Sequence, residues 1–384
     1  MPTVCNLQRA DQASKNAALL QHTTSCPAWL DAYAMFHPTR RGRKGTKYLV
    51  YTCRPKMPGT HSHCLGFGDR FRMIGFLLRL AAAWSRVLLI DWASPVPIES
   101  FFNANRIDWR LTDYERHSVE GLQVTRWGAG ILGKPPDERF VRLVGNTIWH
   151  ASIGNWPATG EQISNYTSPS LSCLWRFLFK PSDAMQRELT AQRVEMFGNA
   201  TQPFWGLHVR MGDRAAGSSF ATETIPKRDT RLTHAQAVAL IGCIRRTAGT
   251  RLPMYIATDN AILKQAIKAG DPRTLIGNAR SNISELTTAF EGVHVRGCTA
   301  CMINPVFTHN FSRAEVEDIF VEMGLLVQSQ CFYYAPSNFA ETVKAWAGPQ
   351  HCNRELGLSA CLAAERKRRK GALSQALLQT LTVG

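Results

Sequence analysis

The sequence predicts an α/β fold in which two doubly wound domains face a cleft. Short apolar runs, typical of buried parallel strands, alternate with segments of helical periodicity in two parts of the chain, residues 47–92 and 204–348. A long irregular stretch rich in Trp, Arg and Gly, residues 94–156, separates these parts. With 384 residues, 45% of them hydrophobic, the chain is large enough for one or two packed cores.

These patterns divide the chain into four parts. We expect residues 1–45 to be a poorly ordered basic arm, 46–200 an N-terminal Rossmann-like domain, 201–350 a C-terminal Rossmann-like domain, and 351–384 a basic helical tail. The arm ends in a run of Arg, Lys and Gly at 39–47, which either contacts an anionic surface or is a solvated linker.

The N-terminal domain opens with a strand–helix–strand unit. Residues 47–53 (KYLVYTC) have strand composition, and residues 69–83 have the apolar spacing of a helix. Residues 86–92 (RVLLIDW) form a short apolar run that fits a buried parallel strand. A glycine-rich turn precedes the helix, so the unit is a β-α-β motif.

The C-terminal domain continues the alternation. The sequence predicts strands at 204–209, 254–258 and 331–335, and helices at 233–247, 260–269, 312–328 and 339–347. Thr233 is a suitable N-cap, and Gly270 and Gly348 are suitable helix stops.

Charge and composition limit the classes of partner and the location that the protein can have. The net charge of +16 predicts an acidic partner: a phosphorylated ligand, nucleic acid or an anionic glycan. No stretch reaches about 18 apolar residues, so we predict no membrane span, and no secretory signal is visible in the first 25 residues. Eleven irregularly spaced cysteines do not resemble a small disulfide framework, and sequons at Asn165, Asn199, Asn282 and Asn310 favour a secretory history.

Four segments lie where parallel sheets bind ligands, beyond the carboxyl ends of strands. The first is Gly66–Arg72 (GFGDRFR), whose glycines permit close approach and whose helix start offers N–H groups to a phosphate or carboxylate. It departs from the dinucleotide fingerprint, because Phe71 takes the place of the third glycine, although Asp91 could imitate the ribose-binding acid. A tight turn without a ligand is the alternative.

The second segment is Gly206–Asp213 (GLHVRMGD). His208 and Arg210 are two residues apart, so they point to the same face of a strand. An arginine at a strand end suits a diphosphate, because its guanidinium is always charged and binds oxyanions bidentately. Asp213 either orients that arginine or faces the acceptor; the alternative is a buried Arg–Asp pair with a satisfied histidine.

The third and fourth segments also stand at strand-to-helix junctions. Asp259 is either an N-cap or a carboxylate that accepts two hydrogen bonds from a guanine. Ser337, with the backbone amides of Asn338 and Phe339, could hold phosphate oxygens, or Ser337 could simply cap the helix.

Two patterns bear on metals. No Asp-x-Asp sequence occurs, so the acidic motif that holds a metal-bound diphosphate in many glycosyltransferases is missing. Neutralising a departing diphosphate would then fall to Arg210 and helix termini. Cys298 and Cys301, with His294 and His309 nearby, either form a zinc site or are disulfide-bonded or free thiols.

Together these segments resemble GDP-fucose-dependent fucosyltransferases of the protein O-fucosyltransferase and α1,6-fucosyltransferase type. Residues 66–92 resemble their glycine-loop region, and 208–213 (HVRMGD) their His-x-Arg motif. Residues 256–260 (IATDN) resemble their Thr-Asp motif, and 337–342 (SNFAET) their phosphate-binding motif. The resemblance extends over about residues 47–348, with the four motifs in the same order.

The resemblance implies a GT-B fold and inverting transfer of fucose from GDP-β-L-fucose to a glycan or protein hydroxyl, with no metal and no other cofactor. It implies that donor-binding residues come from both domains: Gly66, Phe67, Gly68, Asp69, Arg70, His208, Arg210, Asp259, Ser337, Asn338 and Phe339. Within this set, Arg210 would grip the β-phosphate and Asp259 would recognise guanine. Asp213 would join Arg210 in catalysis, while the general base stays open between Asp69, Asp213 and Glu223.

The resemblance also implies a location in the Golgi or ER lumen. Two alternatives to a fucosyltransferase stay open: a GT-B enzyme that uses another nucleotide sugar, and a non-catalytic relative. Such a relative would bind a nucleotide, or would bind nucleic acid through the basic run 366–370, although we do not expect nucleic acid to be the partner.

Overall fold

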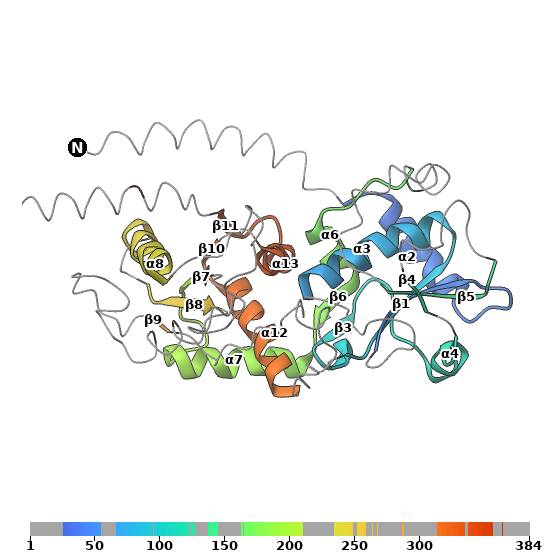
Figure 1. Ribbon diagram of the computed structural model, residues 1–384, viewed down its shortest axis with the longest axis horizontal. Helices are drawn as coiled ribbons and strands as arrows, with labels where there is room; N and C mark the ends of the chain where they lie inside the picture. The colour runs from blue at the N-terminus through green and yellow to red at the C-terminus, as the bar shows by residue number, and fades with distance from the viewer. Residues whose placement is uncertain are drawn as a thin grey trace, which may run out of the picture. The chain divides into compact units, whose positions relative to one another are not determined.

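The computed structural model divides the chain into two compact units (Figure 1). The first comprises Met1–Gln186, Val295–Glu317 and Lys344–Gln350, and the second Arg187–His294, Asp318–Val343 and His351–Gly384. The structure describes residues 26–54, 67–94, 96–122, 124–126, 137–144, 163, 165–209, 234–248, 252–258, 263, 267, 286–287, 313–334, 337–355 and 363. Each unit contains a parallel sheet.

The first unit is built on a four-stranded sheet with the order β2-β1-β5-β4, parallel throughout. Its strands are β1 (Tyr48–Cys53), β2 (Val87–Trp92), β4 (Val124–Arg126) and β5 (Phe140–Val144). Every residue of β1 and β2 is buried, as expected for parallel strands covered on both faces. β1 and β2 lie where the sequence predicts them, whereas β4 and β5 lie in the stretch predicted to be irregular.

Helices cover both faces of this sheet. α3 (Phe67–Ala83) connects β1 to β2, and its Phe67 and Phe71 contact Trp92 on one face. On the other face, Val50 and Leu89 pack with Val119 of α4 (Asp113–Val119). The remaining elements of this unit are η1 (Ile98–Ser100), β3 (Phe102–Ala104), α6 (Leu171–Leu178) and β6 (Phe179–Pro181).

A third helix, α2 (Trp29–Arg40), covers the open edge of β2. The Tyr33 hydroxyl donates to the Arg86 carbonyl (2.9 Å) and accepts from the Leu88 N–H (2.8 Å). His37 Nε2 lies 3.0 Å from the Leu88 carbonyl. These contacts satisfy backbone groups that an edge strand leaves exposed. Burial lowers the pKa of His37 to about 4, so its ring is neutral at pH 7.

Residues 26–45 therefore correct the prediction of a poorly ordered arm over residues 1–45. Besides α2, a disulfide ties Cys26 to Cys173 of α6, 147 residues away. The basic run after α2 is anchored as well, because Arg41 Nε donates to the Glu115 carboxylate at 2.9 Å. The helix was missed because its partners lie far along the chain.

An aromatic cluster forms a second core of the first unit. Its centre is Trp175 of α6, whose ring lies 4.6 Å from Phe71 and 5.3 Å from each of Phe102, Phe179 and Trp346. Trp346 belongs to the last turn of α13 (Asn338–Ala347), a helix whose first residues are assigned to the second unit.

The second unit contains a five-stranded sheet with the order β11-β10-β7-β8-β9, also parallel throughout. Its strands are β7 (Trp205–Val209), β8 (Met254–Thr258), β9 (Leu286–Thr287), β10 (Cys331–Tyr334) and β11 (Cys352–Glu355). The chain runs from β7 to β8 and β9 on one side, then to β10 and β11 on the other. The strand order thus reverses between β7 and β10.

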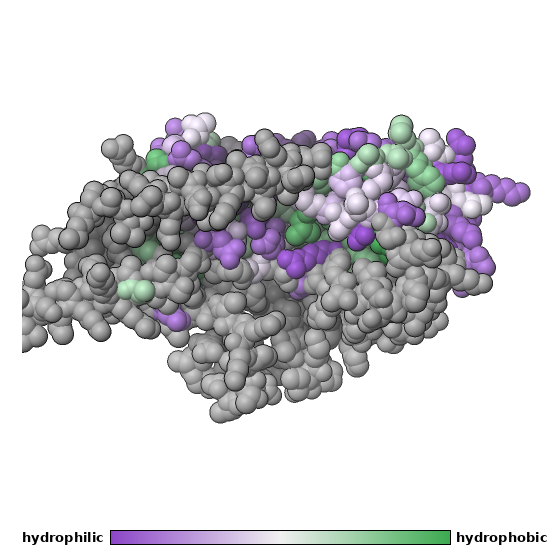
Figure 2. Space-filling view, turned by 90° about the horizontal axis from the view of Figure 1, so that it is seen from above, coloured by the Kyte–Doolittle hydropathy of each residue, from purple (hydrophilic) through white to green (hydrophobic). Residues whose placement is uncertain are grey.

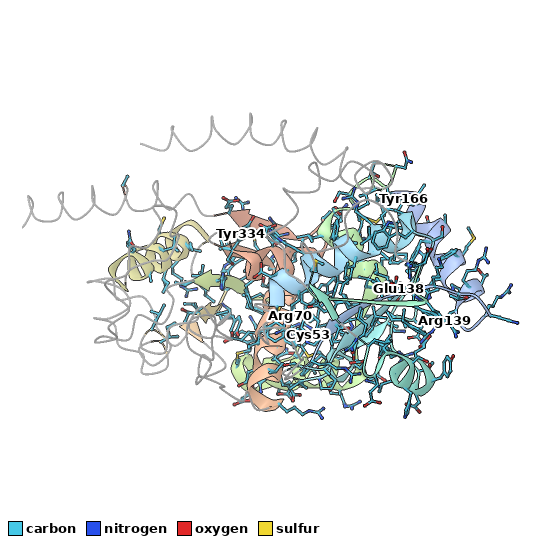
Figure 3. The ribbon with its side chains drawn as sticks, turned by 45° about the vertical axis from the view of Figure 1, so that its right-hand side comes forward. Cys53, Arg70, Glu138, Arg139, Tyr166 and Tyr334 are labelled. Carbon is cyan, nitrogen blue, oxygen red and sulfur yellow. A yellow bond between two sulfur atoms is a disulfide. The ribbon has the colours of Figure 1, made fainter. Side chains whose placement is uncertain are left out.

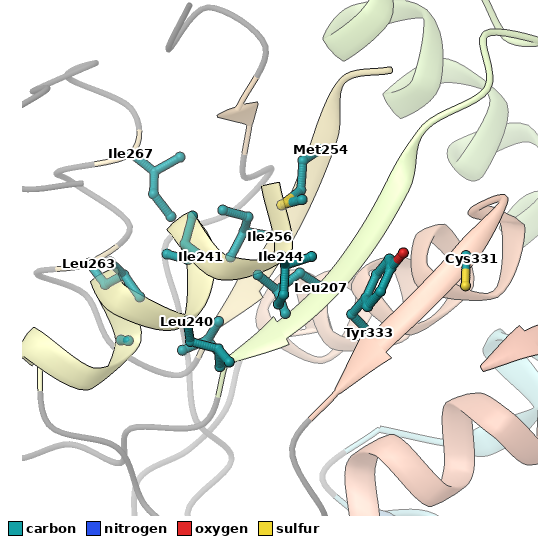
Figure 4. Close-up of a cluster of buried hydrophobic side chains, with 12 residues drawn as sticks. Leu207, Leu240, Ile241, Ile244, Met254, Ile256, Leu263, Ile267, Cys331 and Tyr333 are labelled. Carbon is teal, nitrogen blue, oxygen red and sulfur yellow. The ribbon is translucent and has the colours of Figure 1, made fainter. Parts of the chain in front are cut away.

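Helices α8 (His234–Ala248) and α12 (Arg313–Gln328) pack on opposite faces of this sheet. On the α8 face, the strands and helices bury one apolar cluster (Figure 4), which comprises Leu207, Val209, Ala237, Leu240, Ile241, Ile244, Met254, Ile256, Leu263, Ile267, Cys331 and Tyr333. On the other face, α12 approaches β7 closely at Gly206. A Cβ there would lie 2.7 Å from Ser329 Oγ and 3.1 Å from Leu326 Cδ2.

The described ends of α8, β8, β10, α12 and α13 agree with the predicted ranges to within two residues. α7 (Asp183–Phe197) begins in the first unit and continues into the second. Residues 352–355 form β11 at the sheet edge, so the predicted helical tail from residue 351 is wrong for these residues. Beyond residue 355 only residue 363 is described.

Disulfides fasten the second unit too. Cys331 and Cys352 lie opposite each other on β10 and β11 and are joined by a disulfide, with their Cα atoms 4.5 Å apart. Cys53 of β1 and Cys243 of α8 each take part in a disulfide as well. Disulfides of this kind persist in oxidising compartments.

The described surface mixes polar and apolar side chains. On the described part of the face in Figure 2, hydrophilic side chains are interspersed with hydrophobic ones. Among the residues that the structure describes, no helix is both long enough and apolar enough to span a bilayer.

Replacing both Cys331 and Cys352 with alanine should lower the free energy of unfolding by about 2–4 kcal/mol, because the unfolded chain regains the freedom of a closed loop. Urea denaturation with circular dichroism measures this change. An unchanged denaturation midpoint would show that the bond between β10 and β11 does not stabilise the unit.

Candidate functional site

Three predicted site segments follow three neighbouring strands of the second unit. His208 is the penultimate residue of β7, and Thr258, the last residue of β8, immediately precedes Asp259 in the sequence. Ser337 stands between β10 and α13. Since β10, β7 and β8 are adjacent and parallel, their carboxyl ends share one edge of the sheet. Segments that are distant in the sequence therefore converge there.

Parts of these segments are not described. Arg210 and Asp213 come after the last residue of β7, and Asp259 comes after β8, but all three lie outside the described residues. So do Glu223 and Gly66. Their roles stay predictions that rest on sequence position.

His208 is on β7, at the side where the strand order reverses toward β10. Its ring stacks on Phe339 of α13, with centroids 4.7 Å apart and an interplanar angle of 27°. On the neighbouring strand, Tyr334 pairs in register with His208 and is buried (Figure 3). The histidine is only 6% exposed. The stack joins two predicted segments 131 positions apart, at the place where open α/β sheets bind ligands.

Ser337 acts as the N-cap of α13. Its hydroxyl oxygen accepts a hydrogen bond from the Ala340 N–H at 3.0 Å, and its carbonyl accepts from the Glu341 N–H at 3.0 Å. This cap uses a lone pair, so the hydroxyl proton can still be donated to an oxyanion. The N–H groups of Asn338 and Phe339 belong to the first turn, where the helix offers no acceptor of its own. Capping and phosphate binding are therefore compatible at this helix start.

The glycine-loop residues Phe67, Gly68, Asp69 and Arg70 form the first turn of α3 in the first unit. Phe67, Gly68 and Arg70 are buried, and Asp69 is half-buried. Their predicted contact with the donor stays a prediction.

The Arg70 guanidinium is packed between aromatic rings. It lies 4.7 Å from the ring centre of Trp92 and 5.1 Å from that of Phe67, and it donates to the Ser94 carbonyl at 2.5 Å (Figure 3). Burial lowers the pKa of Arg70 to about 10, so the group still carries its charge at pH 7. Arg70 thus fixes the start of α3 against the segment after β2.

Asp91 does not serve as a ribose-binding acid. It is 2% exposed, and its carboxylate contacts Arg54 at 2.5 Å and two further guanidinium groups, of Arg116 and Arg142, at 3.9 Å. Arg142 is itself buried. The interpretation of the glycine loop as a dinucleotide-binding fingerprint therefore loses its acidic residue. The carboxylate instead neutralises three arginines: Arg54 after β1, Arg116 of α4 and Arg142 of β5.

Sequence reasoning did not find the His208–Phe339 stack or the arginines around Asp91, because both depend on strand neighbours. Among the described residues, no group of three or more His, Cys, Asp or Glu side chains could hold a metal ion. The candidate zinc residues Cys298 and Cys301, with His294 and His309, lie outside the described residues.

Comparisons with known proteins give a match in fold. No family profile and no curated protein matches the sequence. A mutant of Arabidopsis thaliana FUT1 in complex with GDP matches with a TM-score of 0.51 and 13% identity, over 86% of this chain and 78% of that chain. NodZ α-1,6-fucosyltransferase soaked with GDP-fucose matches with a TM-score of 0.43 and 13% identity, over 78% of this chain and 93% of that chain.

The likeness to FUT1, together with the two parallel sheets, confirms the predicted α/β fold class of the GT-B type. The chain has a glycosyltransferase-like fold. The predicted cleft between the domains stays a prediction.

Replacing Asp91 with asparagine should lower the free energy of unfolding by about 3–5 kcal/mol, because the buried guanidinium of Arg142 loses its countercharge. Urea denaturation measures the loss. Asp137→Asn is the matched control: this exposed carboxylate pairs with Lys47 at 3.3 Å, and its loss should cost under about 1 kcal/mol. Equal losses in the two variants would refute the structural role of Asp91.

Proposed function

We propose that this protein is a fucosyltransferase that transfers fucose from GDP-β-L-fucose to an acceptor hydroxyl, with inversion and without a metal. One observation carries the proposal. Three of the four motif segments end or begin at the carboxyl edge of β10, β7 and β8, and two of them meet in the His208–Phe339 stack. The convergence of these three segments at one end of the sheet supports a common binding site.

In this proposal the diphosphate lies between the end of β7 and the start of α13. The N–H groups of Asn338 and Phe339, with the Ser337 hydroxyl, bind phosphate oxygens at a positive helix end. Arg210 comes directly after β7 in the sequence, and its guanidinium would bind the β-phosphate bidentately. Donors on both sides would hold a diphosphate in one orientation.

The base would be bound one strand further along. Asp259 follows β8, which pairs directly with β7, and its carboxylate would accept two hydrogen bonds from the Watson–Crick edge of guanine. His208 would contact the nucleotide beside it. FUT1, which shares the fold, was solved in complex with GDP, and this supports a guanine nucleotide as ligand.

The reaction follows from these positions. The acceptor oxygen attacks the anomeric carbon in line, the bond to the β-phosphate oxygen breaks, and the configuration changes from β to α. Arg210 and the amides at the start of α13 take up the charge that develops on GDP. The hydroxyl proton passes to a base among Asp69, Asp213 and Glu223. Fucose as the sugar, and a glycan or protein as the acceptor, rest on the motif resemblance.

A location in the ER or Golgi lumen belongs to the same proposal. The disulfides Cys26–Cys173 and Cys331–Cys352 support it, because the lumen is oxidising.

Arg210→Ala should reduce transfer by about 100-fold or more without unfolding the protein, because the departing GDP loses its main countercharge. Arg210→Lys should also be badly impaired, since one ammonium cannot replace the guanidinium fork. The assay follows GDP release from GDP-fucose with an acceptor library. Arg139→Ala is the matched control, an exposed arginine of the first unit, and should leave turnover unchanged. Normal turnover of Arg210→Ala would place leaving-group stabilisation elsewhere.

GDP should stabilise the protein against heat, and UDP should not. At a free concentration 100 times its Kd, GDP should add about 2.7 kcal/mol. Asp259→Ala should remove the preference for GDP, because its carboxylate reads guanine. A thermal-shift titration measures both effects, and a response to UDP alone would favour a different nucleotide sugar.

A further inference from the structure

We propose that Asn165 and Asn199 carry N-linked glycans. Each begins an Asn-x-Thr sequon, with Thr167 and Thr201 supplying the required hydroxyl two residues on. Both asparagines and both threonines are exposed in the folded chain. A bulky, hydrated glycan is tolerated only on such a surface. The inference is independent of the transferase activity.

At Asn165, the next two residues are fastened down while the asparagine stays accessible. The Tyr166 ring packs edge-on against Trp29, with centroids 5.5 Å apart, and the Trp29 Nε1–H donates to the Thr167 carbonyl at 3.0 Å. Arg79 Nε donates to the Tyr166 carbonyl at 2.8 Å. Figure 3 labels Tyr166 on this segment, which leads into α6. A glycan here would project from an ordered segment without disturbing its contacts.

At Asn199, the sequon itself forms the link between α7 and β7. Gly198 ends the helix with a φ of +70°, so the chain turns away immediately before the asparagine. Asn199 Oδ1 accepts hydrogen bonds from the Thr201 N–H at 2.8 Å and from the Thr201 hydroxyl at 2.9 Å. The amide and the hydroxyl are thus close together on an exposed turn, which displays the whole acceptor sequence.

The disulfides indicate the compartment in which these sites would be glycosylated. Cys26–Cys173 and Cys331–Cys352 form where thiols are oxidised, and in eukaryotic cells that is the lumen in which N-glycans are transferred. Cys173 lies only eight positions beyond Asn165, so one short stretch carries both a disulfide and a sequon. Two independent features, the disulfides and the exposed sequons, therefore both indicate passage through the secretory lumen.

The chemistry requires a lipid diphosphate-linked oligosaccharide and the enzyme that transfers it. The side-chain Nδ2 of the asparagine forms a bond to C1 of the first sugar, and the bond from C1 to the diphosphate oxygen breaks. The lipid diphosphate leaves with the electron pair, and one amide proton passes to a base of that enzyme. No oxidant or reductant is involved.

The test uses the full chain produced in a glycosylating eukaryotic host. Peptide N-glycosidase in heavy-oxygen water converts each glycosylated asparagine to a labelled aspartate, which mass spectrometry locates. We expect label at Asn165 and Asn199, and none at Asn105, an exposed asparagine outside any sequon. Thr167→Ala and Thr201→Ala should each abolish label at their own site only.

Disulfide mapping of the same sample reports the compartment. Unlabelled Asn165 and Asn199 in a protein with intact Cys26–Cys173 would overturn the sites, because the chain would have met the lumen unmodified. Unlabelled sites with reduced cysteines would overturn the inference as a whole. Label at one asparagine alone would overturn the assignment of the other.

Discussion

The parallel pairing of β7 with a strand on each side is the constraint on which the second unit depends. β8 and β10 together satisfy both edges of β7, so three strands must end at one edge of the sheet. α12 can approach β7 this closely because Gly206 has no side chain. A Cβ there would lie 2.7 Å from Ser329 Oγ. A ligand bound at this end of the sheet would touch segments that folding has already brought together.

The sequence could predict those strands whose residues are apolar on both faces. β1, β2 and β8 are buried along their whole length, so composition alone identifies them. β5 contains Arg142, whose charge is offset by Asp91 from another strand, and β11 is a polar edge strand fastened by Cys331–Cys352. Local patterns miss such elements, because the residues that stabilise them belong to other elements of the chain.

The candidate site was likewise predictable only where its features depend on local sequence. The types and spacing of the residues at the strand ends predicted where His208 and Ser337 would lie, and the sheet order puts both beside the strand-order reversal. The stack of His208 on Phe339 and the packing of Arg70 on Trp92 were not predictable, since each joins separate elements. Asp91 was misjudged in the opposite way. Its spacing from the glycine loop suggested that it binds a ribose, but its burial among arginines gives it a structural role.

The most direct test of the proposed donor site is a crystal structure of the protein with GDP. The account predicts the diphosphate between the end of β7 and the first turn of α13, with its oxygens on the N–H groups of Asn338 and Phe339. It predicts the guanine beside the end of β8, on Asp259. A nucleotide bound away from this edge, or electron density that shows no nucleotide at saturating GDP, would contradict it.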